Sequence, residues 1–307
     1  MPLDCTRRTA LLALGGAPAL AAASSVRPIR LGGPVFLKSE DPFELAREHR
    51  RLGYSAAYCP NVKPEDSARQ REIEKAFAAA NVVIAEVGAW VNMLDPDPAK
   101  RRENQRVVAS RLAVADAVGA RCCVDIAGSY NPKVWYGPEA RNLSREFFDA
   151  TVENCRRILD EVRPKRTRFT LEMMGWALPD GPDSYIELIR AIDRPGFGVH
   201  IDVCNVINSP SRFYYNRRVI ADCFEKLGRW IVSCHAKDLA WPAEMNVHFV
   251  EVVPGRGEID YSEYLRRVAA LPVDAPLMLE HLSTADEYEE GKQYIQRVAR
   301  KLGLAFA

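Results

Sequence analysis

The sequence predicts a (β/α)8 barrel of the TIM type. Its 307 residues suffice for such a barrel, which takes roughly 250 residues, and for a short leader before it. From Arg27 onward, short apolar runs alternate with longer amphipathic segments, which is the pattern of consecutive βα units. Eight such units can be counted, and no GxGxxG motif follows the first apolar run. A closed barrel is therefore favoured over an open dinucleotide-binding sheet.

The expected strands are apolar runs, each followed by a segment whose apolar residues recur with helical spacing. In chain order the strands cover residues 29–36, 56–59, 82–90, 122–127, 169–173, 198–203, 231–237 and 277–281. The helices cover residues 42–52, 66–80, 100–118, 145–162, 184–192, 219–227, 261–269 and 285–302. The stretches after the third, fourth, sixth and seventh strands are long. Barrel enzymes build their active sites from C-terminal strand ends and the following loops, so these stretches are expected to carry function.

The first residues are expected to form a separate export signal. Arg7 and Arg8 precede an uncharged stretch, residues 9–23, that is rich in Ala, Leu and Gly and ends in small residues. The paired arginines resemble a twin-arginine signal, although Ala10 replaces the expected Phe. A membrane anchor is the alternative, but the stretch is shorter than the roughly 20 residues of a span. We expect a signal over residues 1–23, a catalytic barrel over residues 24–307, and a periplasmic or secreted protein without membrane association after cleavage.

Charge and cysteine content narrow the classes of partner and cofactor. The chain has 42 basic and 41 acidic residues and a net charge of +1, so no general attraction to nucleic acid is expected. Eight cysteines are present, but Cys5 lies in the leader and no CxxC pair exists. Most of the others lie in apolar, strand-like runs. Buried thiols are therefore expected, rather than a disulfide framework or a cysteine zinc site.

An acidic or imidazole side chain stands at or near the end of each of the last four expected strands. They are, in chain order, Glu172, Asp202, His235 and Glu280. A buried carboxylate without a partner is costly, so each must be paired, protonated or bound to a metal. One such residue would be ordinary, but four successive strands indicate a shared site. Three carboxylates and one imidazole suit a divalent cation with positions left open for substrate oxygens.

These motifs resemble the sugar phosphate isomerase/epimerase family, whose members have a xylose-isomerase-like barrel. The segments HIDVCN (residues 200–205), HAKD (residues 235–238) and PGRGEIDY (residues 254–261) look like the family's sixth strand, seventh strand and following loop. The resemblance covers essentially everything after the leader. It implies one divalent ion, Mn²⁺ first and Mg²⁺, Co²⁺ or Zn²⁺ as alternatives. Its implied ligands are Glu172, Asp202, His235 and Glu280.

The resemblance also implies a reaction, an isomerisation or epimerisation of a carbohydrate or related polyol. A proton would move on the carbon beside a carbonyl while the metal stabilises the enediolate. Glu172 and Glu280 are then expected to be both ligands and the catalytic acid–base pair. The expected partner is a small carbohydrate, and a homodimer is expected by analogy with barrels of this family.

Six residues near the expected strand ends are candidates for substrate binding. They are Asn205, Lys237, His200, Trp176, Trp241 and Arg256. Glu86 on the third strand could also face inward, but it is expected to be structural. Two substrate-gripping positions of ketose 3-epimerases correspond to Leu178 and Trp241, so simple free-ketose epimerisation is not the expected reaction. Indole faces pack well on sugar rings, although core packing explains the tryptophans equally well.

Three other functions compete. A metal-dependent lyase could act on keto-glycosides, by elimination or C-glycoside cleavage, without returning the proton. A non-catalytic sugar-binding barrel is disfavoured because all four ligand positions carry good ligands. Apurinic endonucleases share the barrel, but they need a richer histidine cluster and a basic groove, whereas this chain has five histidines and almost no net charge.

Overall fold

The structure, a computed structural model, describes residues 26–307. The expected export signal, residues 1–23, lies outside the described residues. Within residues 26–307, no helix combines the length and the apolar composition that crossing a membrane requires.

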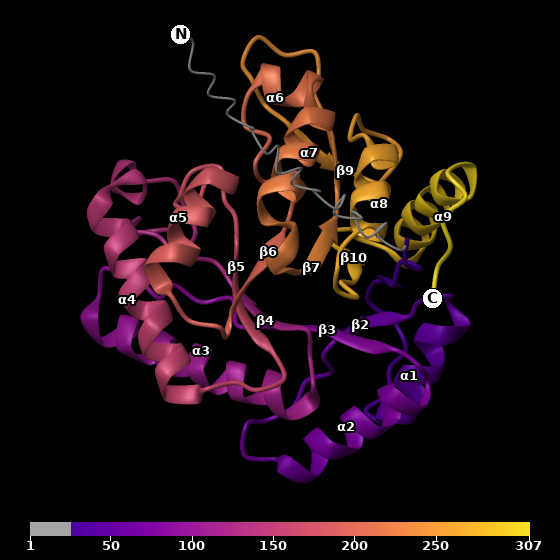
Figure 1. The fold of residues 1–307 in the computed structure, drawn as a ribbon, viewed down its shortest axis with the longest axis horizontal. Helices are drawn as coiled ribbons and strands as arrows, with labels where there is room; N and C mark the ends of the chain where they lie inside the picture. The colour runs from indigo at the N-terminus through magenta and orange to yellow at the C-terminus, as the bar shows by residue number, and fades with distance from the viewer. Residues whose placement is uncertain (1–25) are drawn as a thin grey trace, which may run out of the picture.

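Eight parallel strands close into a barrel at the centre of the molecule (Figure 1). Around the barrel the order is β1-β10-β7-β6-β5-β4-β3-β2. Each barrel strand therefore pairs with the next barrel strand along the chain, and β10 closes on β1. The barrel strands are β1 (Leu31–Gly32), β2 (Ala56–Tyr58), β3 (Val83–Gly88), β4 (Cys122–Asp125), β5 (Arg168–Glu172), β6 (Phe197–Ile201), β7 (Ile231–Ala236) and β10 (Leu277–Leu279). The predicted closed barrel is thereby confirmed.

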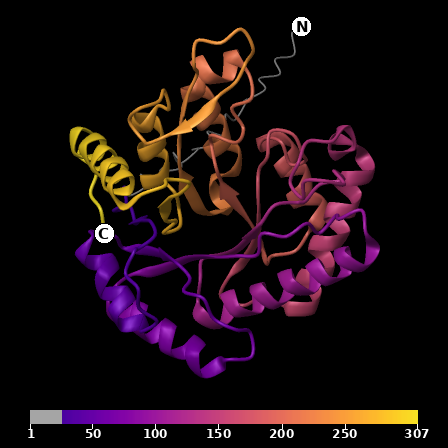
Figure 2. The same cartoon turned by 180° about the vertical axis from the view of Figure 1, so that it is seen from behind.

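Helices surround the barrel, and both views show them outside the strands (Figures 1 and 2). They are α1 (Pro42–Arg51), α2 (Ser67–Ala79), α3 (Pro98–Val118), α4 (Arg145–Val162), α5 (Pro182–Ile192), α6 (Pro210–Tyr214), α7 (Asn216–Leu227), α8 (Tyr261–Ala269) and α9 (Ala285–Lys301). Two 3-10 turns are η1 (Ala140–Leu143) and η2 (Gly228–Trp230). The C-terminal residue Ala307 binds the backbone of Ile29 and the side chain of Arg50, which joins the two ends of the described chain.

The sequence signals at the helix starts act as expected. Asp41, Asp97 and Ser144 each accept a hydrogen bond from a backbone N–H in the first turn of the helix that follows. Thr284 and Glu287 form a reciprocal capping box at the start of α9. These caps fix where each helix begins, and so fix the lengths of the loops before them.

The first strand is much shorter than the predicted residues 29–36. Gly32 lies where a Cβ atom would come within 2.5 Å of both the Ala56 carbonyl oxygen and the Met278 sulfur, so only glycine lets the barrel close here. Pro34 follows two residues later and has no N–H for a ladder hydrogen bond. The chain therefore leaves the barrel after Gly32.

The long segment after the seventh strand holds a hairpin that was not predicted. It pairs β8 (Asp238–Ala240) with β9 (Val250–Val252) in antiparallel register, and it projects beyond the barrel (Figure 2). The predicted strand 231–237 ends instead at Ala236. The hairpin carries one acidic residue, Glu251, back to the barrel mouth.

Asp238 holds this segment together. Its carboxylate, which is fully buried, accepts hydrogen bonds from the backbone N–H groups of Leu239, Gly255, Gly257 and Ile259. One side chain thus fixes both the start of the hairpin and the PGRGEIDY loop.

We expect Asp238→Ala to lower the free energy of unfolding by about 3 kcal/mol, because it leaves several backbone donors without an acceptor. Urea denaturation followed by circular dichroism measures the change. Asp149→Ala, on the exposed face of α4, is the control and should change stability by less than about 0.5 kcal/mol. Equal stabilities of the two variants would contradict this role for Asp238.

Candidate metal centre and cavity

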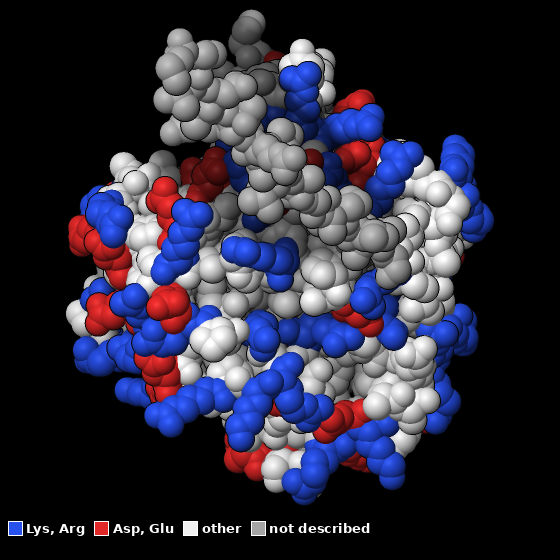
Figure 3. Space-filling view, viewed as in Figure 1, with Lys and Arg blue, Asp and Glu red and all other residues white. Residues whose placement is uncertain are grey.

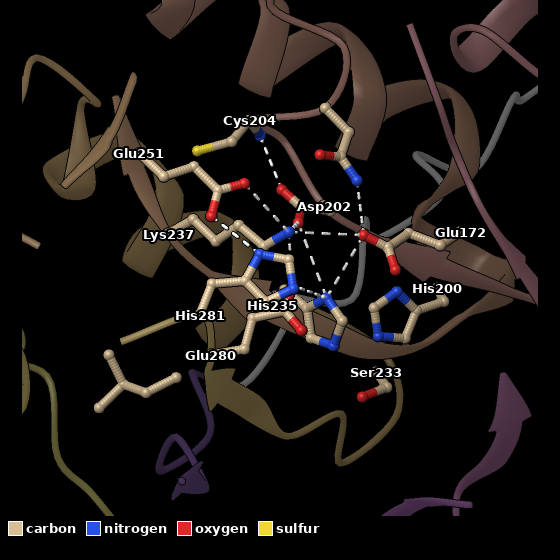
Figure 4. A network of polar contacts seen from close by, with 12 residues as sticks. Glu172, His200, Asp202, Cys204, Ser233, His235, Lys237, Glu251, Glu280 and His281 are labelled. Carbon is tan, nitrogen blue, oxygen red and sulfur yellow. Dashed lines mark hydrogen bonds and ion pairs between the residues drawn. The ribbon is translucent and has the colours of Figure 1, made fainter. Parts of the chain in front are cut away.

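Four adjoining strand ends bring the predicted ligands together. Glu172 ends β5, Asp202 follows β6, His235 lies in β7 and Glu280 follows β10. One possible ligand atom from each side chain lies within 4.8 Å of the corresponding atoms of the others. Parallel strands in a barrel all end at the same face, so residues far apart in the sequence meet there (Figure 4).

His235 Nδ1 faces the three carboxylates. It lies 2.9 Å from Glu280 Oε1, 3.6 Å from Glu172 Oε1 and 3.7 Å from Asp202 Oδ2. Asp202 and His235 are fully buried, and Glu172 is nearly so. Two buried carboxylates, Glu172 and Asp202, and the partly exposed Glu280 repel one another and lose hydration, so the cluster requires compensating positive charge.

The donor atoms fit a divalent cation. Asp202 Oδ2, His235 Nδ1 and Glu280 Oε1 are buried, and none has a hydrogen bond of good geometry, although they lie close to one another and to Lys237. Unpaired buried polar atoms are rare in folded proteins, and three that converge on one point indicate a ligand. Carboxylate oxygens with one imidazole nitrogen form a donor set suited to Mn²⁺, Mg²⁺, Co²⁺ or Zn²⁺.

Lys237 supplies part of the positive charge. Its ammonium nitrogen lies 2.8 Å from Asp202 Oδ2, 2.5 Å from Glu280 Oε1 and 3.6 Å from Glu251 Oε1. The contacts with Asp202 and Glu280 are ion pairs that lack the geometry of hydrogen bonds. Burial favours neutral lysine, but the carboxylates outweigh it and raise the pKa of Lys237.

The positive charges of Lys237 and His235 also lower the pKa values of the neighbouring carboxyl groups. Burial favours protonated Glu280, yet His235 and Lys237 lower the pKa of its carboxyl to about 2. Burial likewise opposes ionisation of Asp202, whose pKa Lys237 and His235 hold well below its usual range. Both carboxyls are therefore ionised at neutral pH, as metal ligands must be.

Behind the cluster, inside the barrel, Glu86 orients His235. Glu86 Oε2 lies 3.4 Å from His235 Nε2 and 3.5 Å from His200 Nε2, while Ser233 donates to Glu86 Oε1. Burial raises the pKa of Glu86, but His235 and His200 reverse the effect and lower it overall. A carboxylate behind a metal-binding histidine fixes the ring and leaves the other nitrogen facing the ion. Glu86 thus does not line the cavity but supports His235, one of the candidate ligands.

A cavity of about 510 Å³ opens above the cluster. Its lining includes Glu172, Asn205, Lys237 and Glu280. Its other residues are mainly aromatic or apolar; they are Tyr58, Trp90, Ile126, Trp135, Tyr136, Met174 and Trp176, with Glu251 and His281 at the polar end. A smaller cavity of about 230 Å³ adjoins it and shares its polar residues.

Three of the six predicted substrate-binding residues line the larger cavity. Asn205 donates a hydrogen bond of 2.5 Å from its side-chain nitrogen to Glu172 Oε1, so it also orients that carboxylate. Lys237 and Trp176 line the cavity as well.

The other three lie elsewhere. His200 is fully buried beneath the metal centre, against Glu86 and His235, and does not line the cavity. Trp241 packs against Phe213 and Phe249 in an aromatic cluster outside the cavity. Arg256 lines only the smaller cavity and is engaged by Glu290 through two hydrogen bonds, of 2.8 and 2.5 Å. For His200 and Trp241 the structure corrects the prediction, because neither side chain reaches the space where a substrate would lie.

Two further residues near the cluster, Glu251 and His281, were not predicted. Glu251 Oε2 binds His281 Nδ1 at 2.8 Å, and its other oxygen faces Lys237 (Figure 4). Glu251 comes from the unpredicted hairpin. The alternation of Val250, Glu251 and Val252 was the available signal for a strand there.

Comparison with known proteins agrees with this architecture. The model of the family described as "Xylose isomerase-like TIM barrel" matches residues 43–298. The chain belongs to this xylose isomerase-like TIM barrel family. No curated protein sequence matches the chain.

Solved structures of the xylose isomerase-like barrel include proteins of several activities. A xylose isomerase-like TIM barrel protein from Mycobacterium smegmatis, in complex with magnesium, has a TM-score of 0.60 and 17% identity, and the match covers 84% of this chain and 88% of that chain. 3-Keto-D-glucoside 4-epimerase from E. coli has a TM-score of 0.62 and 11% identity, and the match covers 88% of this chain and 100% of that chain. Endonuclease IV from Thermus thermophilus has a TM-score of 0.64 and 14% identity, and the match covers 89% of this chain and 100% of that chain. At such identities the likeness shows the fold alone.

We expect Glu86→Gln to weaken Mn²⁺ binding about tenfold, because removing a carboxylate behind a ligating histidine loosens the ring and lowers its basicity. Isothermal titration calorimetry on metal-stripped protein measures the dissociation constant. Glu103→Gln, on the exposed face of α3, is the matched control and should bind like the wild type. An unchanged constant in a folded Glu86→Gln protein would show that Glu86 does not support the site.

Proposed function

We propose that this protein is a divalent-metal-dependent isomerase or epimerase that acts on a carbohydrate or related polyol. One observation carries the proposal, the meeting of Glu172, Asp202, His235 and Glu280 beside a cavity wide enough for a sugar. A structural metal site would be closed by protein ligands, whereas Glu172 and Glu280 of this cluster line the open cavity. The family membership and the epimerase among the solved structures support the same conclusion.

The metal would be held by those four side chains, and we propose Mn²⁺ as the ion. The magnesium complex of the Mycobacterium smegmatis protein supports a divalent cation on this fold. When bound, such an ion supplies Lewis-acid stabilisation of negative charge on substrate oxygens.

The chain's own residues would move the proton. Glu172 and Glu280 both line the cavity, and they come from β5 and β10, which are separated around the barrel by β6 and β7. Two carboxyls that approach a substrate from different strands can remove a proton from one face of a carbon and return it to the other. Asn205 holds the Glu172 carboxylate in place, and the Lys237 ammonium can donate to a substrate oxygen.

Charge favours a small substrate over a polyanion. On the face drawn in Figure 3, basic side chains are numerous, but neutral and acidic side chains interrupt them. The net charge of +1 supports the same preference.

Export through the leader over residues 1–23 is part of the proposal, and the N-terminal sequence of protein recovered from the periplasm would test it.

We expect the purified protein to bind about one equivalent of divalent metal. Glu280→Gln should weaken binding at least about tenfold, because it removes a charged ligand at the centre of the cluster. Elemental analysis and Mn²⁺ titration measure both. Glu290→Gln, on the surface of α9, is the control and should leave the metal content unchanged. A wild-type protein that binds no metal after Mn²⁺ loading would refute the catalytic proposal.

Proton transfer gives a second test. The metal-loaded protein should exchange deuterium from D₂O into a suitable keto-sugar at the carbon beside the carbonyl. Glu172→Gln and Glu280→Gln should each slow the exchange about 100-fold or more, since each removes an acid–base group. NMR and mass spectrometry follow the label and the products. Epimers indicate the proposed reaction, whereas loss of a leaving group identifies a lyase.

A further inference from the structure

The cavity has an aromatic wall, formed by Trp90, Trp135, Tyr136 and Trp176. These residues come from the loops after β3, β4 and β5, the side of the barrel away from Glu251 and His281. Trp90 and Trp176 are 40% and 36% exposed, and Tyr136 is 47% exposed. Large apolar side chains gathered around an opening at such exposure mark a surface that a ligand covers.

Contacts between the loops hold the aromatic wall in shape. The Trp176 indole nitrogen donates a hydrogen bond of 2.7 Å to the backbone oxygen of Tyr136. The rings of Trp135 and Tyr136 meet edge to face, with centroids 5.2 Å apart. Two loops from neighbouring strands are therefore fastened together, and their aromatic side chains are set before any ligand arrives.

Trp90 is held by its backbone. Its φ of 48° lies in the left-handed region, which a bulky side chain rarely adopts. Its indole also lies against Gly88, where a Cβ atom would overlap the ring nitrogen. Conformational strain and a glycine that makes room for the ring together place an aromatic side chain at the cavity, and strain of this kind gathers at functional sites.

The cavity also has polar lining residues at the strand ends. Glu172, Asn205, Lys237 and Glu280 present charged and hydrogen-bonding groups there, and Figure 4 shows Glu172, Lys237 and Glu280 converging. The complementary ligand has an apolar face and a hydroxylated edge. A pyranose ring has both, because its C–H groups gather on one face and its hydroxyls point outward, whereas an open-chain sugar presents hydroxyls on all sides. Aromatic faces carry negative charge and attract the weakly positive C–H groups.

We infer that this site takes a ring-closed pyranoside, a sugar locked as a ring by a substituent on its anomeric carbon. The ring would stack on the aromatic wall and direct one edge toward Glu172, Glu280 and Lys237. The cavity of about 510 Å³ lies within the roughly 300–1,000 Å³ of pockets for drug-sized ligands, which leaves room for the substituent.

Together with the proposed function, this ligand class has a chemical consequence. A locked ring cannot open to expose its own carbonyl, so proton transfer needs a ketone on the ring itself. The base takes a proton from the neighbouring carbon, the C–H electrons form the enolate, and a proton returned from the other face gives the epimer without net oxidation. An oxidoreductase must therefore supply the substrate by oxidising a ring hydroxyl.

Binding of two probes tests the inference. Methyl β-D-glucopyranoside is a locked ring, and D-glucitol is an open chain that cannot close. Ligand-observed NMR titration should show about tenfold tighter binding of the glycoside, the effect of one well-formed aromatic contact. Trp90→Ala and Trp176→Ala should each weaken glycoside binding several-fold, and Trp176→Phe should retain part of it. Trp230→Ala is the control, because Trp230 lies before β7 at the other end of the barrel and should leave binding unchanged.

Equal binding of the two probes, no binding of the glycoside, or folded Trp90 and Trp176 variants that bind it like the wild type would overturn the inference. Circular dichroism establishes folding, and the Trp176→Phe protein serves if Trp176→Ala unfolds. Metal content measured on the same samples separates the two proposals. Glycoside preference without metal would refute the proposed function alone, and bound metal without glycoside preference would refute the ring inference alone.

Discussion

The repulsion among three carboxylates, two buried and one partly exposed, is the constraint on which the rest of the site depends. Glu172, Asp202 and Glu280 are held together by strands that the barrel's hydrogen bonds fix in register, so they cannot move apart to relieve it. Lys237 and His235 offset part of the negative charge. Glu86 and Glu251 lie close enough to these cations to share them, which leaves the cluster short of positive charge. The divalent ion that we propose would supply the missing positive charge and would be bound by these oxygens.

The barrel makes this arrangement possible because its interior is filled unevenly. Small side chains at Gly32, Ala56 and Ala85 let the strands close around Met278. Toward β6 and β7, Glu86, His200 and Ser233 occupy the interior instead. This polar layer supports His235 from behind, so that the metal centre rests on a second set of buried polar groups rather than on hydrocarbon.

The fold and the meeting of the four candidate ligands were predictable because both follow from local patterns. Alternating apolar runs and helices indicate the barrel, and a barrel brings all C-terminal strand ends to one face, so Glu172 and Glu280 had to be close together. Predictions for single side chains beyond the strand ends were less successful. His200 was expected at the cavity because alternation along the strand turns it inward with Asp202, but it lies one layer deeper and meets Glu86. Trp241 follows the strand as closely as Trp176 follows its own, yet the hairpin turns it toward Phe213 and Phe249. Neither outcome is encoded within a few residues, because each depends on packing between loops that are distant in the sequence.

The fold determines where the strand ends lie but not how the loops pack, so a similar fold does not decide the reaction. An epimerase and an endonuclease both match this barrel over nearly nine tenths of the chain, at 11% and 14% identity. Barrels of this kind share the arrangement of the strands, and in this chain the candidate metal ligands lie at the strand ends. What they vary is the loops, and here three loops bear the aromatic wall while a fourth carries Glu251 on its hairpin. The metal cluster can stabilise negative charge on many substrates. The loops choose among them, because only a ligand with one apolar face and one polar edge satisfies both sides of this cavity without leaving buried groups unpaired.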